Sequence, residues 1–264
     1  MKLVVVGQGR VGSALVPALV AAGVDARGVS ARSLPPGLEA DVYVLAVRDP
    51  SIAAVTRAVL LRHRGAPPTV LHTAGGVPSQ VLRDAGAARA AVMHPLVAFA
   101  GVAPILAGSL FAVEGDAADV AESLVLRLGG TPLRLDAQAL VRYHAAAVLT
   151  ANHVLALVDQ SRDLMASVGA DPRLAEAGLS SLFSAVAANL SRLGLPAALT
   201  GPIARGDVAA VRGHLSALTG EARATYVTTA VRLCSIARRQ GSARVEDLLA
   251  IEALLALYLP AFVD

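Results

Sequence analysis

The first half of the chain alternates short runs of β-type residues with segments of helical periodicity. Strands are predicted at Lys2–Val6, Val24–Val29, Asp41–Val47, Thr69–Thr73, Ala90–His94, Ser109–Glu114 and Thr131–Leu135. Helices are predicted between them, at Arg10–Ala22, Pro50–Arg62 and Asp116–Leu128. This alternation is typical of an α/β domain in which helices cover both faces of a parallel sheet.

After Asp136 the pattern changes to long helical periodicity with few β-type runs. Residues 137–168 predict one helix of about thirty residues. Asp171 is expected to cap the next helix, with Pro172 at its first position. Helices are then predicted at Pro172–Leu193, Asp207–Leu218, Glu221–Gln240 and Val245–Leu259. The sequence therefore predicts two domains, an α/β domain over residues 1–136 and an all-helical domain over residues 137–264.

A glycine-rich turn separates the first predicted strand from the first helix, with the sequence Gly7-Gln8-Gly9-Arg10-Val11-Gly12. Gly7 allows a tight turn, Gly9 lets the backbone approach a pyrophosphate, and Gly12 allows the helix to pack closely on the strand. The helix N-terminus offers free N–H groups and the positive end of its dipole to phosphates. The alternative is a glycine turn without a ligand. The position between strand and helix favours a Rossmann-type dinucleotide site.

The end of the second predicted strand indicates which dinucleotide this turn binds. An NAD-preferring domain usually places Asp or Glu about 20 residues past the turn, where it holds the ribose 2′-hydroxyl. Residues 29–33 occupy that place and include no acid. Arg32 can pair with a 2′-phosphate, and Ser30 and Ser33 can add hydroxyl donors. Although Arg32 can also be a simple solvated loop residue, NADP(H) is the favoured cofactor.

Two more loops follow predicted strands, with the sequences Val47-Arg48-Asp49-Pro50 and His72-Thr73-Ala74-Gly75-Gly76. In an open α/β sheet the ligand lies beyond the carboxyl ends of the strands, so both loops are expected to face the cofactor. Val47, Arg48 and Thr73 are therefore candidate cofactor contacts. Asp49 is expected instead to cap the helix that follows it.

Two histidines are candidates for proton transfer. His94 closes a predicted strand at the same edge, and His144 lies near the start of the long helix, with Asn152 two turns further on. Eight helical positions place Asn152 within about 80° of His144, so both can border one cleft between the domains. Histidine exchanges protons near neutral pH, and Asn can orient a carbonyl or imine. A structural role is the alternative for each histidine.

The segment Thr200–Asp207 interrupts the helical pattern. It can be a turn that leads to a helix capped by Asp207. Arg205 beside a Gly-Pro turn also suits carboxylate or phosphate binding, with Thr200 nearby. The sequence leaves both interpretations open.

Composition narrows the function classes. Net charge is +3 and aromatic residues make up 3%, and the scattered basic residues favour neither a nucleic-acid nor a membrane-surface role. Cys234 is the single cysteine, so an internal disulfide and a cysteine-based metal cluster are excluded, and no metal is expected. The first residues lead directly into a strand without a charged leader, so a cytoplasmic location is expected.

Several segments together resemble a bacterial family of the domain-of-unknown-function 2520 type, which has a Rossmann-like domain and an uncharacterised helical C-terminal domain. The most specific segments are HPLVAF from His94, YHAAAVLTAN from Tyr143 and LTGPIARGDVAAVRGHL from Leu199, and the further ones are Val5–Ser13, Leu45–Ile52 and Leu71–Gly76. The family is similar to pyrroline-5-carboxylate reductase, ketopantoate reductase and the 3-hydroxyacid dehydrogenases. The resemblance implies a helical domain like the C-terminal domain of 6-phosphogluconate dehydrogenase.

The resemblance also implies an NADP-dependent reductase whose helical domain forms a homodimer and completes the active site. Ketopantoate reductases and hydroxyacid dehydrogenases use a lysine on the interdomain helix, but Lys2 in the first strand is the sole lysine here. The expected function is reduction of a small C=O or C=N compound, with His144 as proton donor or carbonyl polariser, Asn152 orienting the substrate, and Thr200 and Arg205 holding a carboxylate. The alternatives are a non-catalytic NADP-binding sensor or assembly protein, and hydride exchange with a deazaflavin.

Overall fold

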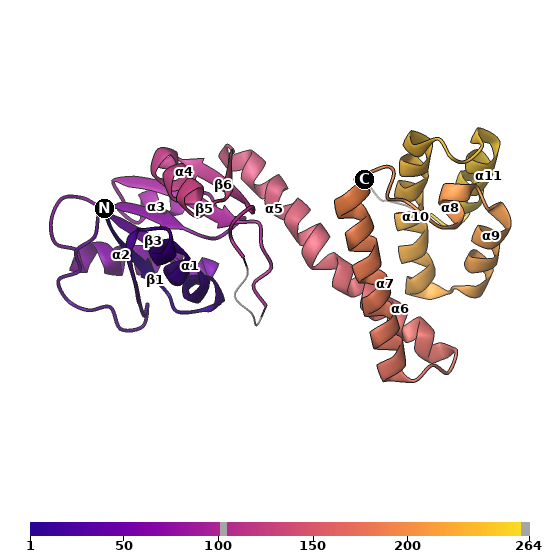
Figure 1. The fold of residues 1–264 in the computed structure, drawn as a ribbon, viewed down its shortest axis with the longest axis horizontal. Helices are drawn as coiled ribbons and strands as arrows, with labels where there is room; N and C mark the ends of the chain where they lie inside the picture. The colour runs from indigo at the N-terminus through magenta and orange to yellow at the C-terminus, as the bar shows by residue number, and fades with distance from the viewer. Residues whose placement is uncertain (101–104, 260–264) are drawn as a thin grey trace. The chain divides into compact units, whose positions relative to one another are not determined.

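The computed structural model of the 264-residue chain describes residues 1–100 and 105–259. It contains two compact units, Met1–Val154 and Leu155–Asp264. The first unit contains the sheet, and the described part of the second, up to residue 259, contains helices without strands. The colours of Figure 1 follow the chain from one unit to the next. The predicted fold class, a Rossmann-type sheet domain followed by a helical domain, is confirmed.

The first unit is built on a seven-stranded sheet with the order β2-β1-β3-β4-β5-β6-β7. The strands are β1 Lys2–Val6, β2 Asp25–Val29, β3 Val42–Leu45, β4 Thr69–His72, β5 Arg89–Pro95, β6 Leu110–Gly115 and β7 Thr131–Arg134. Neighbouring strands are parallel except β5 and β6, which pair antiparallel. All four residues of β3 and of β4 are buried; β3 is apolar throughout, whereas β4 has apolar residues only at its two central positions.

Helices cover both faces of this sheet, as predicted. They are α1 Arg10–Ala21, α2 Ile52–Arg62 with the 3-10 turn η1 Asp49–Ser51 before it, α3 Gln80–Asp84 and α4 Ala118–Arg127. Leu15 of α1 and Leu124 of α4 belong to one apolar cluster, and Ile52 of α2 and Leu82 of α3 belong to another. Because side chains alternate along each strand, these two clusters lie on opposite faces. The five-residue helix α3 was not predicted, since it is too short to show a helical period.

The long helix predicted for residues 137–168 is wrong as a single element. The structure has two helices, α5 Ala137–Ala151 and α6 His153–Ser167, separated at Asn152. Asparagine is a poor helix former because its side chain competes for backbone hydrogen bonds, which is consistent with a break at this residue.

The first half of α5 packs on the sheet. Leu140 and Tyr143 contact Val92 of β5 and Ala112 of β6 in a small apolar cluster. Helix α5 therefore lies within the first compact unit, although the sequence assigns it to the second domain. A functional boundary at residues 136 and 137 stays a prediction.

The second unit contains most of α6 and five further helices, α7 Pro172–Leu193, α8 Pro202–Arg205, α9 Val208–Ala217, α10 Gly220–Gln240 and α11 Val245–Ala256. Its core joins α9, α10 and α11 through residues such as Val211, Cys234 and Ile251. Asp171 accepts hydrogen bonds from the N–H groups of residues 173 and 174, and Asp207 accepts one from residue 210. Both predicted helix caps are confirmed.

Helix α7 has an apolar stripe that faces solvent. Leu179 is half-buried, and Phe183, Val186, Leu190 and Leu193 are each at least 43% exposed. Their spacing alternates between four and three residues, which places all five side chains on one face. Ala175 is the one buried residue described in this 22-residue helix. An apolar stripe of this length is typical of a helix with a partner surface.

Among the described residues, none of the helices combines the length and the apolar character that a bilayer crossing requires.

Candidate functional site

The glycine turn predicted to bind a pyrophosphate has the geometry that this role requires. Gly7 has φ of +118°, and a Cβ there would overlap the carbonyl oxygen of Ala46. A Cβ on Gly12 would overlap the carbonyl oxygen of Gly7, so helix α1 can approach β1 only because residue 12 is glycine. Gly9 differs from both, because a Cβ there would meet no atom within 4 Å. The space beside Gly9 is open to a ligand.

The N-terminus of α1 is free for an anion. Gly9 is the N-cap and provides no side-chain cap, and the first turn contains no acidic residue. The first N–H groups of a helix have no partner within the helix, and the dipole adds positive potential there. Gln8 holds the turn, since its carbonyl accepts from the Ser13 hydroxyl at 3.1 Å. Arg10 adds a cation, with its Nη1 3.4 Å from the carbonyl of Phe99.

The position of β1 in the sheet supports the same site. Strand β1 pairs with β2 on one side and with β3 on the other, so the chain changes direction across the sheet at this strand. Ligands of open α/β sheets bind outside the carboxyl ends of the strands at such a switch point. Gly7 to Gly12 begin at the carboxyl end of β1.

The turn after β2 leaves Arg32 free to meet a phosphate. The Arg32 N–H donates to the Ser30 hydroxyl at 3.2 Å, and the Ser33 N–H donates to the Ser30 carbonyl at 3.3 Å. The Arg32 side chain is exposed, and it forms no ion pair with the residues that the structure describes. An exposed guanidinium in a turn that also contains two serines and no acidic residue suits a 2′-phosphate.

The loops after β3 and β4 lie at the same edge. Arg48 is exposed and Val47 is half-buried, so both are available at the surface. The Thr73 N–H and hydroxyl are directed at the carbonyl of Leu45, at 3.2 and 3.5 Å, so this side chain holds the loop to β3. The predicted cap role of Asp49 is wrong: residue 49 is the first residue of η1, the N-cap is Arg48, and no side chain caps this turn.

The two candidate histidines lie together in the first unit. The rings of His94, on β5, and His144, on α5, have centroids 5.6 Å apart and are nearly perpendicular. Gly75 is in contact with both, because a Cβ there would lie 2.7 Å from Nε2 of His94 and 2.6 Å from Nδ1 of His144. Nδ1 of His144 is buried and makes no hydrogen bond within the described residues. The structure therefore brings the two candidate histidines, which the sequence singled out separately, into one cluster.

Tyr143 completes this cluster and was not recognised from the sequence. Its hydroxyl lies 3.0 Å from Nδ1 of His94, and the two rings meet edge to face. Burial raises the pKa of Tyr143 to about 12, so the phenol keeps its proton. Burial, with a smaller contribution from His144, lowers the pKa of His94 to about 4. His94 is therefore neutral at physiological pH.

His72 is a third histidine in this region. It is fully buried, and its Nδ1 accepts from the Ala74 N–H at 3.2 Å. Burial lowers the pKa of His72 to about 4. Its neutral ring thus shapes the start of the loop that contains Gly75. The alternation of β4 could have indicated that residue 72 points inward, since Val70 is buried on the same face.

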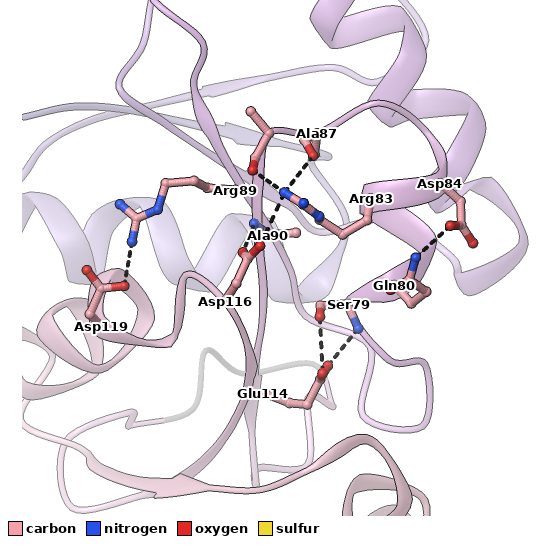
Figure 2. A network of polar contacts seen from close by, with 11 residues as sticks. Ser79, Gln80, Arg83, Asp84, Ala87, Arg89, Ala90, Glu114, Asp116 and Asp119 are labelled. Carbon is pink, nitrogen blue, oxygen red and sulfur yellow. Dashed lines mark hydrogen bonds and ion pairs between the residues drawn. The ribbon is translucent and has the colours of Figure 1, made fainter.

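The far end of this loop is fixed by Glu114 of β6. Figure 2 shows its carboxylate at Ser79, where it accepts from the backbone N–H at 2.7 Å and from the hydroxyl at 3.1 Å. Beside it, Asp116 accepts from the Ala90 N–H at 2.7 Å and pairs with Arg83 at 3.2 Å. The loop from His72 to Ser79 is therefore anchored at both ends.

The remaining predicted site residues are not brought into this cluster by any contact in the structure. Asn152 ends α5 and is exposed. Thr200 and Arg205 belong to the second unit, where they line a cavity of about 400 Å³ with Gly201, Gln240 and Ser242 among the other lining residues. Gln240 donates to the Leu199 carbonyl at 3.0 Å, and Ser242 donates to the Ala204 carbonyl at 2.8 Å. The roles of Asn152, Thr200 and Arg205 toward a substrate stay predictions.

The sequence model of a domain of unknown function, DUF2520, matches residues 109–233. The chain carries a DUF2520 domain. The DUF2520 match begins in the sheet unit and ends in α10, and it includes two of the three segments that suggested the resemblance, from Tyr143 and from Leu199. The predicted family is confirmed.

Solved structures share the fold over at least 90% of this chain. Protein TM1727 from Thermotoga maritima has a TM-score of 0.72 at 21% identity, over 90% of this chain and 99% of that one. A candidate NADP oxidoreductase, BF3122 from Bacteroides fragilis, has a TM-score of 0.67 at 19% identity, over 90% and 98%. A pyrroline-5-carboxylate reductase from Coxiella burnetii has 0.56 at 16%, over 98% and 99%. No sequence among curated proteins matches this chain.

Proposed function

We propose that this protein is an NADPH-dependent reductase of a small C=O or C=N compound. The observation that carries the proposal is the empty space beside the backbone of Gly9, at the carboxyl edge of the sheet. The neutral His94 contacts His144 at the same edge of that sheet. The named structural relatives support the class, since they include an NADP oxidoreductase candidate and a pyrroline-5-carboxylate reductase. A reductive aminase from Aspergillus terreus, solved with NADPH, has a TM-score of 0.54 at 16% identity.

The cofactor is held by the residues at the switch point. The N–H groups of the first turn of α1 bind the pyrophosphate, with Arg10 as a cation beside it. Arg32, Ser30 and Ser33 bind the 2′-phosphate, since no carboxylate lies at this turn to hold a free ribose hydroxyl. Bound NADPH supplies the hydride; the chain supplies position and electrostatics.

The histidine pair acts on the substrate heteroatom. When the carbon of a C=O or C=N bond accepts hydride, the oxygen gains negative charge and takes up a proton, whereas an iminium nitrogen is already charged. His144 donates that proton or polarises the carbonyl, and neutral His94 provides a hydrogen-bond donor without adding a charge. No lysine is available for this task, because Lys2 lies at the start of β1.

The helical unit is proposed to form a homodimer and to bind the substrate carboxylate. The exposed apolar stripe of α7 can pack against the same stripe of a second chain, because symmetric dimers use the same face of both chains. Thr200 and Arg205, which line one cavity, are the proposed carboxylate ligands.

The cofactor assignment predicts a selective loss on changing Arg32. Arg32→Ala is expected to weaken NADPH binding about 10- to 100-fold, because a charge-assisted hydrogen bond contributes about 1.5–3 kcal/mol. NADH binding is expected to change by no more than about twofold, because NADH has no 2′-phosphate. Isothermal titration calorimetry with both cofactors measures this, and Arg27→Ala, at an exposed position on β2, is the control. Equal losses for the two cofactors contradict the assignment.

The reaction is tested by replacing His144. His144→Ala is expected to lower kcat at least about 100-fold on a substrate identified from a panel of small keto acids and cyclic imines, because general acid catalysis contributes about 10²–10⁴-fold. NADPH affinity is expected to stay unchanged. His153→Ala, at an exposed residue at the start of α6, is the control.

Unchanged turnover in His144→Ala removes this histidine from the mechanism. A wild-type protein that binds NADPH and never oxidises it across the panel supports the non-catalytic alternative instead.

A further inference from the structure

We propose that Tyr143 is a positioning residue that holds His94 as a single tautomer, with its proton on Nε2 and that N–H directed at the reacting group. This inference rests on the proposed reductase function and assigns a role to a residue outside its predicted site. Tyr143 is not proposed to touch the substrate; it acts through His94.

The argument begins with the contact between the two side chains. The Tyr143 hydroxyl lies 3.0 Å from Nδ1 of His94, and the rings are at 83° to one another. A neutral imidazole has one donor and one acceptor nitrogen, so the direction of this hydrogen bond decides which nitrogen carries the proton. If the phenol donates, Nδ1 accepts and Nε2 must be protonated.

A second pair in the same unit shows that a phenol donates to Nδ1 in this arrangement. The Tyr43 hydroxyl lies 3.0 Å from Nδ1 of His63, with the rings also edge to face. Nε2 of His63 lies 2.7 Å from the carbonyl oxygen of Ala66, which can only accept, so Nε2 carries the proton. Nδ1 of His63 therefore accepts from Tyr43. The pair at His94 has the same distance and ring arrangement, and the proposal assigns it the same direction.

The two pairs differ at Nε2, and this difference indicates a function. The Nε2–H of His63 donates a hydrogen bond to the Ala66 carbonyl. By contrast, Nε2 of His94 makes no hydrogen bond with any residue that the structure describes. Nε2 of His94 faces Gly75, beside Nδ1 of His144, which is also without a partner. A donor that is oriented by a tyrosine and left free on its other side is suited to bind an electronegative ligand atom.

The positions of the partners in the fold explain why the pair is rigid. His94 is on β5 and Tyr143 is on α5, whose neighbouring residue Leu140 is fully buried against β5 and β6. The ring of His94 is limited on its other side by Gly75. Rotation of the imidazole would therefore break the bond to Tyr143 and press the ring on the loop.

The test measures the tautomer directly and needs no substrate. With ¹⁵N-labelled histidine in the full-length protein, long-range proton–nitrogen spectra distinguish protonated from unprotonated ring nitrogens, and the chain has six histidines to assign. The wild-type protein is expected to show His94 with the proton on Nε2 at neutral pH. A proton on Nδ1 overturns the proposal without any variant.

Tyr143→Phe then tests the cause. The variant is expected to show a mixture of His94 tautomers and a kcat about tenfold lower, because one buried hydrogen bond contributes about 1 kcal/mol and its loss misorients the donor. KM and NADPH affinity are expected to stay within about twofold, since the bond orients a group rather than binding substrate. Tyr226→Phe is the matched control, because Tyr226 lies 3.0 Å from Nδ1 of His214 in the same edge-to-face arrangement.

The outcomes separate the two proposals. A single Nε2–H tautomer that persists in Tyr143→Phe, or an equal fall of kcat in Tyr226→Phe, overturns the role of Tyr143. If Tyr143→Phe changes the tautomer populations of His94 but the wild-type protein never oxidises NADPH, the reductase function is overturned. The orientation of His94 by Tyr143 then has no role in catalysis.

Discussion

Gly9→Ala is expected to weaken NADPH binding about 10- to 100-fold while leaving the thermal unfolding temperature within about 2 °C of the wild-type value. The backbone at Gly9 has φ of −76° and ψ of −171°, which alanine adopts without strain. A Cβ there meets no protein atom within 4 Å, so the fold has room for it. The added methyl group occupies the space that the pyrophosphate needs, which costs hydrogen bonds to charged oxygens of about 1.5–3 kcal/mol each.

The controls for this prediction come from other glycines. Gly213→Ala, within α9 and also without an atom near its Cβ, is expected to leave NADPH affinity unchanged. Gly12→Ala is expected to destabilise the fold itself, because its Cβ would overlap the carbonyl oxygen of Gly7. Calorimetry and thermal melts measure both quantities. NADPH affinity that is unchanged in Gly9→Ala would remove the turn from the cofactor site.

Val186→Asp is expected to raise the dissociation constant of the proposed homodimer at least about 100-fold, because a buried unpaired carboxylate costs several kcal/mol. Val186 is 52% exposed and lies in the stripe with Phe183 and Leu190, so the substitution costs little within one chain. Ala188→Asp is the control, since residue 188 is exposed on the opposite face of α7.

Analytical ultracentrifugation over a concentration series measures the association. The wild-type protein and Ala188→Asp are expected to sediment as dimers, and Val186→Asp as a monomer. A wild-type protein that is monomeric at micromolar concentration contradicts the proposal, and the α7 stripe then has another partner.

The sequence was sufficient to predict the parts of the fold that repeat a local pattern. Strand Lys2–Val6 and helix Pro172–Leu193 have the predicted bounds, since each has a continuous pattern and, for the helix, an Asp-Pro start. The glycine turn could be predicted because its three glycines have separate geometric tasks within six residues. Asn152 was read as one more residue of a long helix, because hydrophobic periodicity continues across the break at this residue.

The histidine cluster could be predicted only in part. His94 and His144 were singled out by their positions after a strand and on a helix, and the structure places their rings side by side. Tyr143 was passed over because its partner is 49 residues away on another element, and no local pattern relates a phenol to a ring nitrogen over that distance. The contact between His94 on β5 and Tyr143 on α5 depends on the tertiary fold. In particular it depends on Leu140, which packs α5 against β5 and β6.

The loop between β4 and α3 requires glycines because they have no side chain, and not because of their backbone conformation. Neither Gly75 nor Gly76 has a positive φ, and both are pressed against imidazole rings. At such backbone angles, exchange of glycine for alanine ordinarily stabilises a protein by about 0.4–1 kcal/mol through the unfolded chain. Here the added methyl group would overlap the imidazole rings, so exchange of glycine for alanine does not stabilise the protein at this loop. The same tight contact limits which side chains can replace the neighbouring histidines.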